Sequence, residues 1–238
     1  MKIMGLQKST LLDYPGKVAC TVFTGGCNFF CPFCHNAELI SPRKEEPGLL
    51  EKDLLAFLRK RRGILDGVCI SGGEPLLHTG LSGLIREMKE LGYLVKLDTN
   101  GSFPERLKRL VGEGLLDYVA MDIKNSKKKY AATAGVEAFQ IEPVEESVRF
   151  LMEGNVPFEF RTTVVRELHS GEDIEEIGEW ISGDEPYFLQ SFEPSDHVPD
   201  LRLSAYGKEE METLADILRE KVPNVELRDY NNILCLYR

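Results

Sequence analysis

The sequence predicts an α/β fold, specifically a single-domain, partial (β/α)6 TIM-like barrel. Short runs of β-branched and apolar residues alternate with stretches of helical spacing along most of the 238 residues. Such alternation favours parallel strands joined by right-handed crossovers, with helices on the outside. No linker rich in Pro, Gly or Ser divides the chain. We therefore expect one domain over residues 1–238, with a core at 18–191 and an extension of helix and strand at 192–238.

The strands are predicted from the runs rich in β-branched and apolar residues. Most of the runs lie in the expected core, and one lies near the C-terminus. The predicted strands are residues 18–24, 67–70, 93–98, 118–122, 158–165, 187–191 and 225–227. In barrels of this kind the functional site lies at the carboxyl ends of the strands. We therefore look for residues with chemical roles just after each run.

The helices are predicted between these runs. Residues 51–62 place Leu54, Leu55 and Leu58 on one face, and Gly63 supplies a stop. The other predicted helices are residues 81–91, 104–111, 143–152, 172–181 and 208–221. Each would cover the sheet with an apolar face.

Composition and charge narrow the class of protein. The chain has 29 Lys and Arg against 39 Asp and Glu, which gives a net charge of −10. An acidic surface argues against nucleic-acid binding, because phosphate contacts need basic residues. No apolar run approaches the ~18 residues of a spanning helix, and the first ten residues lack a long apolar stretch. We expect a cytoplasmic protein that binds neither membrane nor nucleic acid.

Three of the six cysteines lie within eight residues. Cys27, Cys31 and Cys34 form a C-x3-C-x2-C pattern directly after the first predicted strand. Gly25 and Gly26 allow the backbone to turn into this loop. In the cytosol thiols stay reduced, so clustered cysteines indicate metal or redox chemistry rather than disulfides.

The spacing favours an iron–sulfur cluster over zinc. A closed zinc site needs four ligands, usually in two pairs, and no second pair follows downstream. His35 is an awkward fourth ligand because it is adjacent to Cys34. Iron–sulfur cubanes usually have four thiolates, so three leave one iron open to a small molecule. Structural roles are expected for the isolated Cys20, Cys69 and Cys235.

This loop resembles that of the radical S-adenosylmethionine superfamily. The match consists of C-x3-C-x2-C after the first strand with the aromatic Phe33 between the last two cysteines. The resemblance implies a [4Fe–4S] cluster held by the three cysteines, with Phe33 beside the cofactor. The open iron would bind S-adenosylmethionine, and the reduced cluster would cleave it to a 5′-deoxyadenosyl radical. The cofactors would carry the difficult chemistry while the protein positions them.

Two later motifs extend the resemblance. Gly72, Gly73 and Glu74 follow the second strand, where adjacent glycines allow close backbone approach to a ligand. Alone they would form a generic turn, but in this position they resemble the family motif that holds the methionine amino group. Asp98 and Thr99 end the third strand and are expected at the same cofactor.

The last strands contribute charged and polar candidates. Asp122 and Lys124 share one face of an extended strand and could form an ion pair, yet they resemble an Asp-x-Lys motif that contacts S-adenosylmethionine. Asp98 with Asp122 could also hold a monovalent cation, as in some relatives. Arg161 needs an anionic partner, either a structural acid or the methionine carboxylate. Gln190 stands where relatives present a ribose contact.

The segment 11–27 further resembles the activating enzymes of glycyl-radical proteins, the anaerobic ribonucleotide reductase and pyruvate formate-lyase types. This resemblance implies an anaerobic radical S-adenosylmethionine oxidoreductase. It would abstract a glycine α-hydrogen from a glycyl radical enzyme and draw electrons from a flavodoxin- or ferredoxin-like donor. Superfamily membership alone does not set the substrate.

Two alternatives stay open on the sequence. One is a radical S-adenosylmethionine enzyme for a small molecule, such as a deazapurine precursor. The other is an electron-transfer or zinc-binding module without turnover. Formation of 5′-deoxyadenosine would separate the enzymes from the module.

Overall fold

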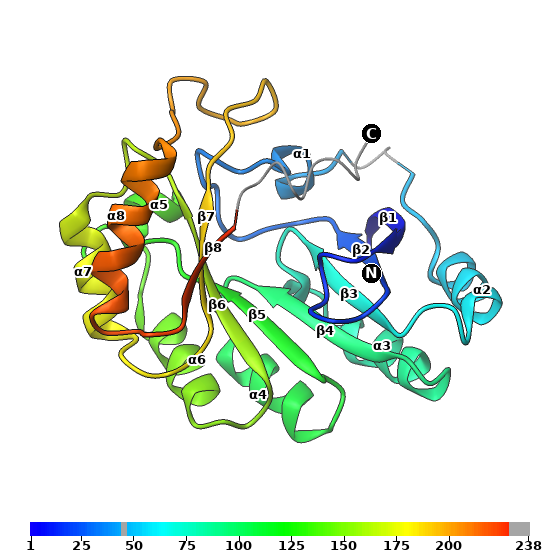
Figure 1. Cartoon of the computed structure of the whole chain (residues 1–238). Coiled ribbons are helices and arrows are strands. Elements are labelled where there is room, and N and C mark those ends of the chain that lie inside the picture. Colours follow the sequence, from blue (N-terminus) through cyan, green and yellow to red (C-terminus); the bar gives the residue numbers. More distant parts are fainter. Residues whose placement is uncertain (44–46, 229–238) are drawn as a thin grey trace.

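The computed structural model describes residues 1–43 and 47–228, which form one eight-stranded sheet with helices along its outside (Figure 1). The strands follow one another across the sheet in chain order. They are β1 (Ile3–Thr10), β2 (Ala19–Thr24), β3 (Gly67–Gly72), β4 (Leu94–Thr99), β5 (Tyr118–Asp122), β6 (Phe158–Val164), β7 (Tyr187–Ser191) and β8 (Val225–Arg228).

The sheet is parallel from β2 to β8, and β1 alone runs antiparallel, beside β2. In the part of the chain that the structure describes, the edge strands β1 and β8 do not pair with each other. The sheet is therefore an open, partial barrel. This confirms the α/β class and the partial barrel that the alternation of strands and helices predicted.

The long helices match the predicted ranges to within two residues at either end. The helices are α1 (Ala37–Ile40), α2 (Glu51–Arg61), η1 (Pro75–Leu77), α3 (Leu81–Glu90), α4 (Pro104–Gly112), α5 (Tyr130–Ala134), α6 (Glu142–Met152), α7 (Gly171–Trp180) and α8 (Lys208–Arg219). The sequence did not predict the short α1, η1 and α5, because three to five residues are too few to show a helical period. These three short elements all lie in loops near the carboxyl ends of strands.

The strand β1 was also missed. Its polar second half lacks an apolar alternation, and Gly5 interrupts it. The strand forms because β2 offers it an edge: Gly5 packs over the Phe23 ring, and Gln7 pairs with Thr21. Pairing with a distant partner therefore overrides weak local propensity.

The two faces of the sheet differ in chemistry. Outward residues such as Val22, Ile70 and Leu97 join the core formed with the helices. The alternating inward positions instead carry polar and charged side chains, including Lys96 and Glu159, which are 1% exposed. The barrel interior therefore consists largely of ionic and polar contacts, and it leads directly to the carboxyl ends of the strands.

The structural thiols lie as expected where they are described. Cys20 and Cys69 are buried and form no disulfide. Cys235 lies outside the described residues. None of the helices in the described part of the chain is long and apolar enough to cross a membrane.

Candidate active site

The cysteine loop after β2 is held in place by backbone hydrogen bonds from several elements. The amide of Gly26 donates to Leu39 O at 2.7 Å, and that of Cys27 donates to Ile40 O at 3.1 Å, which ties the loop to α1. On its other side the amide of Phe30 donates to Ala134 O of α5 at 2.8 Å. The two short helices that the sequence did not predict thus brace the loop.

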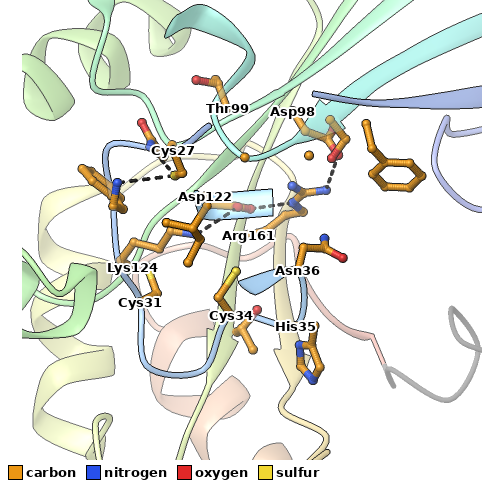
Figure 2. A pocket seen from close by; sticks show the side chains of 18 of the residues that line it. Cys27, Cys31, Cys34, His35, Asn36, Asp98, Thr99, Asp122, Lys124 and Arg161 are labelled. Atoms are coloured by element: carbon orange, nitrogen blue, oxygen red, sulfur yellow. Dashed lines mark hydrogen bonds and ion pairs between the residues drawn. The ribbon is translucent and has the colours of Figure 1, made fainter. Parts of the chain in front are cut away.

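Cys27, Cys31 and Cys34 line one pocket of about 230 Å³ at the carboxyl ends of the strands (Figure 2). Among the described residues, no three histidine, cysteine or carboxylate side chains converge as ligands of a single metal ion would. A cubane binds each thiolate to a separate iron atom, so thiols spaced around a pocket suit it. The donor set therefore fits an iron–sulfur cluster better than zinc.

The thiols are neutral in the protein alone. Burial raises the pKa of Cys27 to about 11 and that of Cys31 to about 12, and it also raises the pKa of Cys34. The nearby ammonium group of Lys124 acts in the opposite direction on all three. Since only thiolates bind iron, loading the site must release protons.

The turn after β3 lies against the cysteine loop. Gly72 has a φ of +118°, and a Cβ there would lie 2.3 Å from Thr24 N. A Cβ on Gly73 would lie 2.0 Å from Gly26 O. Both glycines line the pocket, so their lack of side chains lets two backbone segments meet beside it.

The carboxylate of Glu74 points away from this pocket. It is fully buried and accepts hydrogen bonds from Leu76 N at 3.0 Å, Thr99 Oγ1 at 2.9 Å and Asn100 N at 2.7 Å. Burial raises its pKa to about 7, and these hydrogen bonds act against the rise. Glu74 therefore joins the turn after β3 to the end of β4 and does not line the pocket.

The strand ends β4, β5 and β6 contribute a linked set of charges (Figure 2). Arg161 Nε donates to Asp122 Oδ1 at 2.8 Å, and Arg161 lies 3.4 Å from Asp98 Oδ2. Lys124 Nζ donates to the other Asp122 oxygen at 3.1 Å. Four predicted site residues from three strands are thus brought together at one wall of the pocket.

These contacts keep both carboxylates ionised. Burial would raise the pKa of Asp122, but the charges of Arg161 and Lys124 lower it to about 2. The pKa of Asp98 is also lowered, because Arg161 and Lys96 outweigh the effect of its burial. Arg161 and Lys124 both line the pocket, so their positive charges can receive an anionic group of a ligand there.

Lys96 is a member of this set that the sequence reading did not single out. Its ammonium lies 2.5 Å from Asp98 Oδ1 and 3.9 Å from Cys69 Sγ, and its side chain is 2% exposed. A monovalent cation at Asp98 and Asp122 would have to share those carboxylates with three cationic side chains. The sequence signal that could have identified Lys96 is its position two residues before Asp98, which places both side chains on the inward face of the same strand.

The remaining predicted site residues also line the pocket. Phe33 comes from the cysteine loop, Thr99 from the end of β4 and Gln190 from β7. His35 and Asn36 lie beside them, and His35 Nε2 donates to Glu193 O at 2.7 Å. All predicted positions except Glu74 therefore lie on one cavity, and they come from strands β2 to β7 or the loops that follow them.

Comparison of the sequence with known protein families identifies the family to which the chain belongs. The sequence profile of the radical SAM superfamily matches residues 21–181. The chain belongs to the radical SAM superfamily.

One relative of this radical SAM chain matches almost its whole length. It is the "Putative glycyl-radical enzyme activating enzyme MJ1227" of Methanocaldococcus jannaschii, 32% identical over 96% of both chains. The 7-carboxy-7-deazaguanine synthase of Thermococcus kodakarensis is 27% identical over 77% of this chain and 78% of its own length. The two relatives have names that describe different substrates.

A solved structure shares the radical SAM fold. Streptococcus suis SuiB bound to S-adenosylmethionine superposes with a TM-score of 0.67 at 15% identity, over 87% of this chain and 48% of that longer chain. Membership implies a [4Fe–4S] cluster and S-adenosylmethionine. The three spaced thiols fit the cluster, and the cationic Arg161 and Lys124 on the same pocket fit the carboxylate of S-adenosylmethionine.

Asn100 is the main pocket residue that the sequence reading missed. It follows Thr99 at the end of β4, is 6% exposed and lines the pocket. Its amide reaches the cysteine loop, where it contacts Asn28 and Cys27. The only available signal was its position directly after a strand that carries two other candidates.

Proposed function

We propose that this radical SAM enzyme activates a glycyl radical enzyme by abstracting the α-hydrogen of one glycine in that partner. The supporting observation is the 32% identity to the Methanocaldococcus jannaschii protein over 96% of both chains. A match across the full length includes the loops around the pocket as well as the shared barrel. An anaerobic ribonucleotide reductase or pyruvate formate-lyase type of partner is proposed.

Cys27, Cys31 and Cys34 are proposed to hold the cluster as thiolates, one on each of three irons. When bound, the reduced cluster and S-adenosylmethionine would supply the chemistry: one electron would cleave the cofactor to methionine and a 5′-deoxyadenosyl radical, and that radical would take the glycine hydrogen. Lys124 supports this assignment, because its positive charge opposes the rise in pKa that burial causes in all three thiols.

The surrounding residues are proposed to orient S-adenosylmethionine. The backbone carbonyls at Gly72 and Gly73 can accept hydrogen bonds from its ammonium group. Arg161 and Lys124 offer the positive charge that its carboxylate needs. Glu74 acts indirectly, because its carboxylate holds Thr99 and Asn100 in place.

Two further pocket residues are proposed to contact the cofactor directly. Gln190 on β7 can hydrogen-bond the ribose, and Phe33 can pack against the cofactor. Asp98 and Asp122 hold Arg161 in position through their ion pairs. A flavodoxin- or ferredoxin-like protein is proposed as the electron donor.

The test uses the full chain, reconstituted anaerobically with iron and sulfide and reduced with dithionite. With S-adenosylmethionine it should form 5′-deoxyadenosine, which is measured by chromatography. With a glycyl radical enzyme encoded nearby it should also produce a glycyl doublet in the EPR spectrum. The absence of that doublet with every such partner would contradict the activase assignment, and the absence of 5′-deoxyadenosine would leave an electron-transfer or zinc module.

A small-molecule reaction is the second candidate, since the Thermococcus kodakarensis deazaguanine synthase matches over 77% of this chain. The same reduced enzyme is incubated with a pterin precursor of deazapurines. Conversion of that precursor, coupled to 5′-deoxyadenosine formation without any protein partner, would replace the activase assignment with this one.

A further inference from the structure

The side-chain amide of Asn100 connects the end of β4 to the cysteine loop. Its Nδ2 donates to Asn28 Oδ1 at 3.0 Å and lies 4.0 Å from Cys27 Sγ, within hydrogen-bond range for sulfur. Its Oδ1 accepts from Ser102 N at 3.0 Å and from Ser102 Oγ at 2.6 Å. Asn28 Nδ2 closes the network by donating to Ser102 Oγ at 2.9 Å.

This network fixes which way the amide faces. The backbone amide of Ser102 can only donate, so it requires the oxygen of Asn100 on its side. The nitrogen is thereby placed against Asn28 and Cys27. One of its two N–H groups satisfies Asn28, and the other is left for the Cys27 sulfur.

The position of Asn100 is fixed as well as its orientation. Its backbone amide donates to the buried carboxylate of Glu74 at 2.7 Å. The residue is 6% exposed, so water does not compete for the amide. A donor held by its backbone and by both side-chain atoms needs no reorganisation to bond a thiolate.

Cys27 differs from Cys31 and Cys34 in the hydrogen bonds that its sulfur accepts. Its sulfur also accepts from the backbone amide of Phe29 at 3.4 Å. Cys34 receives a backbone hydrogen bond from Asn36, while the thiol of Cys31 donates to Ala134 O at 3.9 Å. Of these hydrogen bonds to the cysteine sulfurs, the one from Asn100 alone comes from a side chain.

We propose that Asn100 raises the reduction potential of the cluster by donating a hydrogen bond to the sulfur of Cys27. Reduction adds negative charge to the cluster and its thiolates, and a donor at the sulfur stabilises that charge. The inference rests on Cys27 being a cluster ligand, as proposed above. It is independent of which molecule loses the hydrogen.

The test compares two variants of the full chain after anaerobic reconstitution. Asn100→Leu removes the donor and keeps the branched shape with the same number of heavy atoms. Ser102→Ala is the matched control, because it removes the hydroxyl yet keeps the backbone bond that orients Asn100. The reduction potential is measured by EPR-monitored redox titration, with iron content as a check.

Asn100→Leu should keep four irons per chain and show a more negative potential, while Ser102→Ala should match the wild type. Equal potentials in all three proteins would overturn the inference and leave Asn100 a structural role. Cys27→Ala is run in parallel. If that variant retained the full cluster, the ligand assignment itself would be wrong, which is a different failure.

If Asn100→Leu cannot hold the cluster, a measurement on the wild-type protein tests the proposal instead. Protein labelled with [δ-15N]asparagine should show a 15N coupling in the pulsed EPR spectrum of its reduced cluster. Asn100→Asp, which still accepts from Ser102, should lose that coupling. A wild-type spectrum without side-chain 15N coupling would overturn the inference.

Discussion

At the residue scale, the ammonium of Lys96 has a partner that is almost as buried as itself. Its side chain is 2% exposed and that of Asp98 is 14% exposed. Breaking a buried pair costs about 3–5 kcal/mol when it leaves a charge without any partner. Without Lys96, Asp98 would still lie 3.4 Å from Arg161, so its charge would stay partly compensated and the cost would be smaller. Losing one partner of such a pair therefore destabilises the fold more than losing both.

Lys96→Met should therefore lower the free energy of unfolding by about 1–3 kcal/mol, as measured by urea denaturation of the metal-free protein. The double variant Lys96→Met with Asp98→Asn should recover part of the loss. Arg86→Met, which breaks the exposed pair with Glu113, should leave stability nearly unchanged. Equal effects for the buried and exposed pairs would contradict this account.

The cysteines provide a second prediction at this scale. Replacing Cys27, Cys31 or Cys34 by Ala should abolish cluster incorporation, because each would bind a separate iron. Cys20→Ser and Cys69→Ser should retain it, since both thiols are buried away from the loop and do not line the pocket. Iron and sulfide per chain and the visible absorption band are the measurements. Loss of iron in either Ser variant would show that the ligand set is wrong.

Glu74 should make stability depend on pH. Its folded-state pKa of about 7 lies above the ordinary value of 4.5, so the folded state holds its proton longer than the unfolded state does. Its contribution to stability is therefore greatest below about pH 4.5 and falls as pH rises to about 7, by about 3 kcal/mol in all.

We expect the Tm of the wild type minus the Tm of Glu74→Gln, both measured without metal, to fall steadily between pH 5 and pH 7.5. Glu105→Gln, at an exposed position on α4, serves as the control and should follow the wild type. A constant difference between wild type and Glu74→Gln would mean that the carboxylate is already ionised at pH 5.

At the scale of elements, the cysteine loop and the turn after β3 are packed backbone to backbone. Glu74 N donates to Gly26 O at 2.8 Å, and a Cβ on Gly73 would lie 2.0 Å from that same oxygen. An added side chain at Gly73 would therefore clash with backbone atoms, which cannot move aside as the end of a flexible side chain could. The two loops would have to separate.

Gly73→Ala should thus lower the free energy of unfolding by about 1–3 kcal/mol and reduce iron incorporation, because it displaces the loop that carries the thiols. Gly83→Ala on α3 is the matched control, since a Cβ there meets nothing within 4 Å. That variant should be neutral or more stable by up to about 1 kcal/mol. Normal iron content in Gly73→Ala would refute the proposed tight packing.

The elements that the sequence predicted well are those with a strong period. Leu54, Leu55 and Leu58 mark the buried face of α2 and are all buried. The strand β1 and the short helix α5 have no such pattern. They form because another part of the chain offers hydrogen-bond partners, and local spacing does not contain that information.

At the scale of the whole molecule, the polar interior of the barrel leads to a pocket built to receive charged groups. A cluster and S-adenosylmethionine would bind the folded chain and not the unfolded one. Binding of that kind raises the apparent stability by mass action. Folding and loading should therefore be coupled.

The anaerobically reconstituted protein should melt at a higher temperature than the metal-free protein, with a further rise when S-adenosylmethionine is added. Differential scanning calorimetry under nitrogen measures both steps. Cys27→Ala should show neither the rise in Tm after treatment with iron and sulfide nor the further rise with S-adenosylmethionine. Exposure of the loaded protein to air should return its Tm to the metal-free value, because an open iron makes the cluster sensitive to oxygen.

The sequence by itself determined the order of the parallel strands and long helices, the open barrel and the cysteine loop at the carboxyl end of the first parallel strand. Those features depend on residue period and spacing, which are local. Only the tertiary structure decided that Glu74 faces Thr99 and Asn100, that Lys96 is buried against Asp98, and that an asparagine amide lies beside Cys27. The physical reason is that a polar side chain takes its role from its partners, and here those partners come from different strands and loops.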